Sequence, residues 1–171
     1  MLDDTLWLYV ENRFGAITLD GKLAKLPVAP QACTDTGFLE LTAAELGKHR
    51  VFIDLTNEPA NLVELYLARI KQLLKDQQCK ASFIVLVKAQ TNSLYWKLGM
   101  DAAKHLYFLA GKLYLHDRSK AVSFPVAMLS YQGDIKGGPL VLCLNMDEQE
   151  AAPSDYDRMR TLYARSKTPV V

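Results

Sequence analysis

The chain has 171 residues, of which 50% are hydrophobic and 23% are charged, with 20 basic and 19 acidic side chains. This composition is typical of a globular domain and excludes a disordered, collagen-like or low-complexity chain, while the net charge of +1 does not by itself indicate a nucleic-acid partner. The length predicts a single domain, residues 1–171, that buries enough surface to fold alone.

The charge is uneven along the chain. Residues 1–60 contain 5 Lys or Arg and 9 Asp or Glu, whereas residues 61–136 contain 11 and 5. A basic middle segment indicates either a surface that faces a phosphate backbone or a set of solvated helix faces. Both interpretations stay open from the sequence.

The cysteines and the first residues of the chain indicate the cellular compartment that we expect for this protein. Cys33, Cys79 and Cys143 lie far apart and form no Cys-x-x-Cys pair, which predicts reduced thiols and neither a disulfide framework nor a zinc site. The first residues lack a signal-peptide pattern, and no apolar run is long enough to cross a bilayer. We therefore expect a cytoplasmic protein with no membrane contact and no metal.

The N-terminal third contains weak structural signals. Residues 5–10 are compatible with a short helix or an edge strand. Residues 15–19 (GAITL) favour a strand, and Asp20-Gly21 after it is a hairpin signal because both residues tolerate positive φ. Residues 27–37 have no period and are rich in Pro, Ala and Thr, so we expect a loop.

The middle of the chain has the strongest pattern. Thr42 and Glu45 have capping-box spacing, which predicts a short helix that ends at Gly47. Residues 51–55 and 82–87 (SFIVLV) are apolar runs typical of buried strands. The segment from Pro59 to Lys75 joins them as a helix, giving a right-handed parallel βαβ unit, with an apolar face at these positions: Val63, Tyr66, Leu67, Ile70 and Leu74.

The rest of the chain predicts further strands and two helices. One helix follows residue 93, with Leu94, Leu98, Ala102 and His105 at helical spacing, although Gly99 weakens it. The expected strands are residues 105–109, 112–116, 121–131 and 139–144, and residues 155–165 form a closing helix in a C-terminal tail, 145–171.

Polar loops follow the two central strands. VFIDLTNEPA at 51–60 places Asp54, Asn57 and Glu58 at the end of one strand, and KAQTN at 88–92 follows the other. Because the carboxyl ends of parallel strands meet at one edge, we expect both loops to face one crevice. Amide and hydroxyl groups there are suited to binding an amide or a base edge, and no nucleophile elbow for a hydrolase is present in the sequence.

The second half of the chain resembles phage-type DNA adenine methyltransferases. The similar pieces are LVKAQTNSLYWKL, HLYFLAGKLYL and SFPVAMLSY, in the order and at the spacing of that family. FGAITLD at 14–20 resembles the strand before the family's cofactor-binding acidic residue. NEPA at 57–60 stands in the place of the catalytic Asn-Pro-Pro-Tyr, so the resemblance covers about residues 12–131.

This resemblance implies a fold and a chemistry. The fold would be a Rossmann-like α/β methyltransferase domain, a mixed sheet with helices on both faces, and the cofactor would be S-adenosylmethionine. The partner would be DNA, with the methyl group transferred to the N-6 amine of a flipped adenine, and the protein would belong to a phage or mobile element. By resemblance, the catalytic residues are Asn57, Glu58 and Pro59, the cofactor residues Asp20 and Asp54, and the substrate loop Gln90, Thr91, Asn92 and Trp96.

Three positions depart from the family pattern. Ala60 replaces the base-stacking aromatic, Glu58 replaces a proline, and residues 21–24 match the family's small residues poorly. Three functions therefore remain: an active methyltransferase, a methyltransferase-fold binding module for DNA or protein that has lost catalysis, or an unrelated α/β nucleotide-binding or interaction protein.

Several of these residues also have structural interpretations. Asn57 is compatible with a helix cap, as are Thr91 and Asn92. Tyr95 and Trp96 are compatible with core or rim aromatic residues.

Overall fold

The computed structural model describes residues 4–21, 31–32, 37–110, 113–114, 120–132 and 139–145. Its strands are β1 Leu19–Asp20, β2 Gln31–Ala32, β3 Arg50–Asp54, β4 Ser82–Lys88, β5 His105–Ala110, β6 Val126–Gln132 and β7 Leu140–Asn145. Its helices are α1 Asp4–Phe14, the 3-10 turn η1 Phe38–Glu40, α2 Ala43–Leu46, α3 Ala60–Lys75 and α4 Leu94–Met100.

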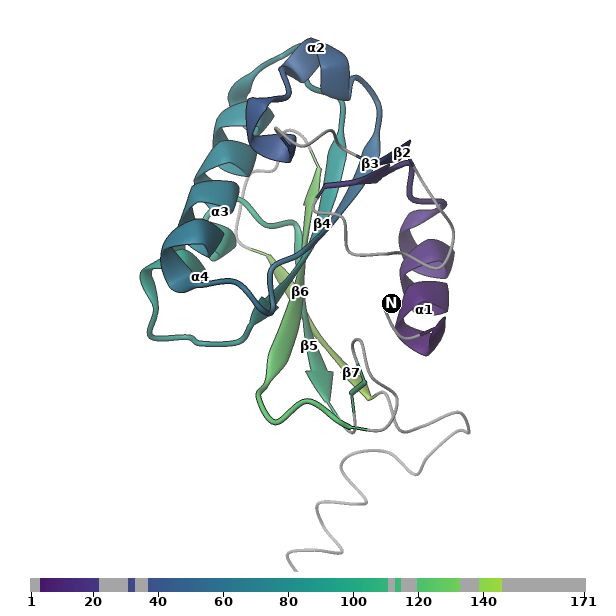
Figure 1. Ribbon diagram of the computed structural model, residues 1–171, viewed down its shortest axis with the longest axis vertical. Coiled ribbons are helices and arrows are strands. Elements are labelled where there is room, and N and C mark those ends of the chain that lie inside the picture. The colour runs from purple at the N-terminus through teal and green to yellow at the C-terminus, as the bar shows by residue number, and fades with distance from the viewer. Residues whose placement is uncertain are drawn as a thin grey trace, which may run out of the picture.

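All the described strands belong to one mixed sheet with the order β2-β1-β3-β4-β6-β5-β7. Strand β6 is antiparallel to β4 and β5, and every other pair is parallel. Helix α1 lies on one side of the sheet, and α2, α3 and α4 lie on the other (Figure 1). The predicted α/β class, with a mixed sheet and helices on both faces, is confirmed.

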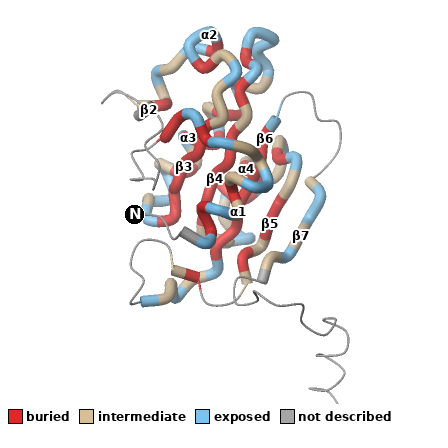
Figure 2. The backbone as a smooth tube through the Cα atoms, turned by 90° about the vertical axis from the view of Figure 1, so that its right-hand side faces the viewer, coloured by how far each residue is buried: buried red, intermediate tan, exposed pale blue. Residues whose placement is uncertain are grey.

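The alternation of side chains along β3 and β4 explains the two layers. Val51 and Ile53 of β3 pack with the core under α3, whereas Phe52 between them faces α1 and makes an edge contact with Trp7, with ring centroids 5.8 Å apart. The two central strands are buried along nearly all their length, while β7 at the sheet edge exposes Leu140 (Figure 2). Burial on both faces explains why β3 and β4 are continuous apolar runs.

The predicted βαβ unit is confirmed in its elements and in the parallel pairing of β3 with β4. The predicted apolar face of α3 packs against the core, with Leu74 partly buried, and its buried stripe also includes Leu73. Helix α2 also forms as predicted, because Glu45 N donates to Thr42 Oγ1 at 3.2 Å and Thr42 N donates to Glu45 Oε2 at 2.8 Å. The second of these bonds lowers the pKa of Glu45.

The first strands differ from the prediction. Residues 5–10, left open between helix and strand, lie within α1. β1 contains only Leu19 and Asp20, and it pairs in parallel with both β2 and β3, so Asp20-Gly21 does not begin a hairpin. The loop predicted at 27–37 contains β2, which is too short to have a sequence period.

The later elements also differ in detail. Helix α4 turns Tyr95, Trp96 and Gly99 inward and leaves Leu94 exposed, so its predicted face is wrong, and His105 begins β5 instead of continuing the helix. The strand predicted from residue 121 begins only at Val126, because Pro125 precedes it. Most of 112–116 and the closing helix at 155–165 lie outside the described residues.

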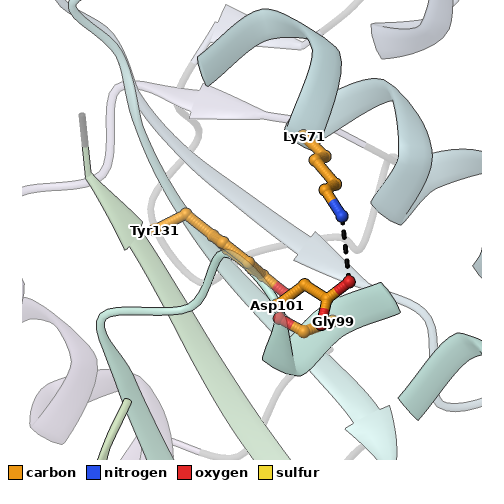
Figure 3. A network of polar contacts seen from close by, with 4 residues as sticks. All are labelled: Lys71, Gly99, Asp101 and Tyr131. Atoms are coloured by element: carbon orange, nitrogen blue, oxygen red, sulfur yellow. Dashed lines mark hydrogen bonds and ion pairs between the residues drawn. The ribbon is translucent and has the colours of Figure 1, made fainter. Parts of the chain in front are cut away.

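A small polar network joins α3, α4 and β6 (Figure 3). Lys71 Nζ lies 2.9 Å from Asp101 Oδ2, directly after α4, and the buried Tyr131 hydroxyl donates to the Gly99 carbonyl at 3.0 Å. Burial raises the pKa of Tyr131, so the phenol stays a hydrogen-bond donor. This contact brings the backbone of α4 close to β6.

The close approach makes Gly99 intolerant of a side chain. A Cβ there would lie 2.9 Å from Leu129 Cδ1 and 3.3 Å from the Tyr131 hydroxyl. We expect Gly99→Ala to lower the free energy of unfolding by about 1–3 kcal/mol, although alanine favours helix formation. Urea denaturation measures this change, with Lys97→Ala at an exposed position of α4 as the control. Unchanged stability of Gly99→Ala would contradict the packing described.

Candidate functional site

A cavity of about 230 Å³ lies where β3 and β4 end. One wall comes from the turn after β3 and the first turns of α3, the other from the end of β4 and the start of α4. The lining residues are Leu55, Glu58, Pro59, Ala60, Val63, Lys88, Gln90 and Tyr95. The prediction that the loops after these two strands face one crevice is confirmed.

The turn after β3 is held by backbone hydrogen bonds. Leu55 N donates to Leu86 O of β4 at 2.9 Å, and Glu58 N donates to Leu55 O at 3.1 Å. This closes a tight turn that leaves Asn57 exposed at its tip and puts Glu58 beside the cavity. α3 then begins after Pro59, which takes the N-cap position without a side-chain cap bond. Asn57 therefore lies two residues before the N-cap, in the segment that leads into the helix, and does not itself cap α3.

Asp54 has a structural partner in the same turn. Its Oδ1 accepts from Thr56 N at 2.9 Å and from Thr56 Oγ1 at 2.6 Å. Asp54 is only 9% exposed and Thr56 is fully buried. The carboxylate thus shapes the turn that positions Asn57 and Glu58, and it does not line the cavity.

The loop after β4 is organised by Tyr95 and Ser93. The Tyr95 hydroxyl lies 2.9 Å from Lys88 O and 3.2 Å from Gln90 Oε1, and it can donate to either. Ser93 caps α4 by accepting from Trp96 N at 3.3 Å, and its hydroxyl donates to Gln90 O at 2.7 Å. Burial raises the pKa of Tyr95, which keeps its hydroxyl a donor at neutral pH.

The structure divides the predicted substrate loop. Gln90 lines the cavity, whereas Thr91 and Asn92 are exposed and neither caps α4. Trp96 is 8% exposed and stacks on Phe108 with ring centroids 5.8 Å apart, so it belongs to the core. A base-stacking role for Trp96 is therefore incompatible with its place in the fold.

Asp20 lies at the same edge of the sheet as the cavity. It is the buried last residue of β1 and pairs with Phe52 of β3, two residues before Asp54. The following Gly21 donates its N–H to Phe52 O at 2.8 Å. Asp20 is outside the cavity lining, and residues 22–30, which contain most of the poorly matched segment after it, lie outside the described residues.

Two lining residues, Lys88 and Tyr95, are not among the predicted catalytic, cofactor or substrate-loop residues, although Lys88 begins the KAQTN loop that the sequence places at the crevice. Lys88 is the last residue of the apolar β4 run, and its Nζ lies 4.8 Å from the centroid of the Phe124 ring. The position of Lys88 at the end of a predicted strand was the feature of the sequence that could have identified it.

The described residues contain no group of three His, Cys, Asp or Glu side chains that could hold a metal ion. No helix in the same part of the chain is long and apolar enough to cross a membrane. No protein-family model matches the chain, and comparison with curated proteins gives no significant match.

Proposed function

We propose that this chain is an S-adenosylmethionine-dependent methyltransferase of Rossmann-like fold that acts on the exocyclic amine of adenine in DNA. The observation that carries the proposal is that Glu58, Pro59 and Ala60 of NEPA line one cavity together with the loop after β4, while Asn57 is exposed directly before them. Those are the two segments in which the chain resembles the catalytic and substrate loops of phage-type adenine methyltransferases. A mixed sheet with helices on both faces is also what that resemblance implies.

One described residue at the end of β1 supports the proposed cofactor site. Asp20 provides a carboxylate at the carboxyl edge of the sheet, beside the strand that leads to Asn57, and a carboxylate there can accept hydrogen bonds from amino or hydroxyl groups of a ligand. When bound, S-adenosylmethionine supplies an electrophilic methyl group. Asp54 is a poorer candidate for direct contact because Thr56 donates twice to its Oδ1.

The residues of the turn would orient the amine. The Asn57 side-chain oxygen and the Glu58 backbone carbonyl would accept its two hydrogens, which directs the nitrogen lone pair away from the protein acceptors. Asn57 is exposed at the tip of the turn, so a base flipped out of DNA can reach it. Where Gln90 Oε1 accepts from Tyr95, Gln90 offers its two N–H donors to a base edge.

A second candidate, base binding without methyl transfer, is favoured by Ala60. Ala60 lines the cavity where the family has an aromatic residue, so a base there would lack a stacking interaction worth about 1–3 kcal/mol. In that case the same edge of the sheet would serve as a binding module for DNA.

The test is transfer of labelled methyl groups from S-adenosylmethionine to unmodified DNA by the full chain. We expect incorporation into adenine, and a loss of about 100-fold or more in Asn57→Ala because the amine is no longer oriented. Asn61→Ala is the matched control, since Asn61 is an exposed asparagine in the first turn of α3 and lies after the NEPA segment. Absence of incorporation with any duplex or single strand would contradict methyl transfer. Calorimetry with the cofactor and with DNA would then test the binding candidate.

Restoring the missing aromatic should strengthen binding. Ala60 is exposed at the start of α3, so a larger side chain there can be accommodated without burying it in the core. We expect Ala60→Tyr to increase affinity for adenine-containing single-stranded DNA about 5-fold to 150-fold, the range that corresponds to one stacked base. Fluorescence anisotropy measures this, with Ala68→Tyr on the exposed side of α3 as the control. Equal affinities of both variants would argue against a base in this cavity.

The proposed activity places the protein in the cytoplasm, where DNA and S-adenosylmethionine occur together. Cys79 and Cys143 are free thiols, which is compatible with a reducing compartment.

A further inference from the structure

A second cavity, of about 220 Å³, lies at the opposite edge of the sheet from the candidate site. Its polar lining comes from five elements: Arg13 of the last turn of α1, Arg50 at the start of β3, Ser82 at the start of β4, His105 at the start of β5, and Ser130 and Gln132 near the end of β6. Because β6 runs against its neighbours, its last residues meet the first residues of the parallel strands. None of the described residues that line this cavity is acidic.

The Arg50 guanidinium is held against the backbone that links α1 to β1. It donates to Ala16 O at 3.2 Å and packs over Gly15, where a Cβ would lie 3.1 Å from Arg50 Cζ. Gly15 also has a φ of +83° at the end of α1, a conformation that favours glycine. The glycine therefore leaves the space that the guanidinium occupies.

Both arginines retain donors for a ligand. Arg13 Nε donates to the Tyr107 hydroxyl at 3.2 Å, and Arg50 donates to the Ala16 carbonyl, so neither of these two bonds goes to a carboxylate. A guanidinium has five N–H donors in a planar fork, and one bond uses only one of them. Within the described ranges, neither arginine forms an ion pair with a carboxylate.

The surroundings of His105 indicate a positive electrostatic potential. Its Nδ1 lies 3.0 Å from Ser130 Oγ, its ring lies 5.9 Å from that of Tyr107, and Lys104 next to it donates to Gln132 Oε1 at 3.3 Å. Burial, together with the charges of Lys104 and Arg13, lowers the pKa of His105. The imidazole thus lies near two positively charged side chains, and a bound anion would offset their positive potential.

We propose that this cavity binds a phosphate group through Arg13, Arg50, His105 and Ser130. Guanidinium groups match two phosphate oxygens at once, and a hydroxyl and an imidazole add single hydrogen bonds. The volume is below the roughly 300–1,000 Å³ of pockets for drug-sized ligands, which suits a phosphate or phosphomonoester group with the rest of the ligand outside. The group could belong to a small phosphorylated molecule or to a nucleic-acid backbone.

The first experiment is an NMR titration of the full chain with inorganic phosphate, with sodium chloride at matched ionic strength as the reference. We expect saturable shifts of the His105 imidazole resonances, and a higher pKa of His105 in the presence of phosphate because the bound anion favours the imidazolium. The charged groups that act on the His105 pKa are Lys104 and Arg13, while Arg50 lines the same cavity and the Tyr107 ring lies next to the imidazole. Identical shifts with chloride would overturn the proposal.

Two variants and one control sharpen this test. Arg50→Gln and Arg13→Gln each remove a charge, and we expect each to weaken phosphate binding at least tenfold, whereas Lys75→Gln on exposed α3 leaves it unchanged. Arg13 is exposed, so its variant is expected to fold even if Arg50→Gln does not. Phosphate affinity that is unchanged in Arg13→Gln, or lost equally in Lys75→Gln, would overturn the site.

The source of the phosphate group is distinguished by comparing two further probes at several salt concentrations. The two probes are a nucleoside monophosphate and an oligonucleotide without a terminal phosphate. Tighter binding of the nucleoside monophosphate would identify a small phosphorylated molecule as the source. Tighter binding of the oligonucleotide would identify a nucleic-acid backbone. In that case the slope of the logarithm of the binding constant against the logarithm of the salt concentration should be smaller by about one in Arg13→Gln. Both outcomes support the phosphate site, whereas no binding of either probe would contradict it. None of these measurements depends on methyl transfer.

Discussion

Replacing Trp96 with alanine should lower the free energy of unfolding by about 3–5 kcal/mol, the usual cost of removing a large buried aromatic side chain. The indole is 8% exposed and stacks on Phe108, on the face of the sheet that α3 and α4 cover. Urea denaturation followed by circular dichroism measures the loss. The resemblance to methyltransferases instead assigned this residue to a substrate loop.

Two further variants distinguish a core role of Trp96 from a role in substrate binding. Trp96→Phe keeps most of the packing and is expected to recover much of the stability. Thr91→Ala, in the exposed part of the same loop, should change stability by less than about 0.5 kcal/mol. A Trp96→Ala protein of normal stability that had lost affinity for DNA would contradict the core assignment.

Replacing Asp54 with alanine should destabilise the protein by about 2–4 kcal/mol, because it leaves two buried donors of Thr56 without their acceptor. These donors are the backbone N–H and the hydroxyl, at 2.9 and 2.6 Å from Asp54 Oδ1. Thermal and urea unfolding measure the effect. Local distortion of the turn should also displace Asn57 and reduce any methyl transfer.

Asp54→Asn is the matched control for this position. Its side-chain oxygen can still accept both bonds, so most of the stability should remain. If Asp54 instead contacts the cofactor through its charge, Asp54→Asn would keep its stability and lose affinity for S-adenosylmethionine, which calorimetry detects. That result would support the predicted contact between Asp54 and the cofactor and would contradict a purely structural role.

The central part of the fold could be predicted because several local signals agree there. β3 and β4 are continuous apolar runs, α3 has a helical apolar stripe, and Thr42 with Glu45 forms a capping box whose partners are three residues apart. These signals depend on residues close in sequence. They were sufficient to place both loops of the candidate site at one edge.

Other features depend on distant partners and were not predicted. The two-residue strands β1 and β2 exist because they pair beside β3, and such short segments have no period of their own. The inward face of α4 is decided by close contact of Gly99 with Leu129 and Tyr131 of β6, about 30 positions later. The phosphate cavity likewise combines Arg13, Arg50 and His105, which no sequence motif connects.

The reversed strand β6 has a consequence for how the chain assembles. β5 and β7 reach the rest of the sheet only through β6, although β5 precedes β6 in the chain. β4 ends at Lys88, and its partner on this side, β6, begins at Val126, 38 residues later. Pairing between strands so far apart in the sequence slows folding. We expect β3, α3 and β4 to form an early cooperative unit, and the register of β6 between β4 and β5 to determine when the other half of the sheet joins it.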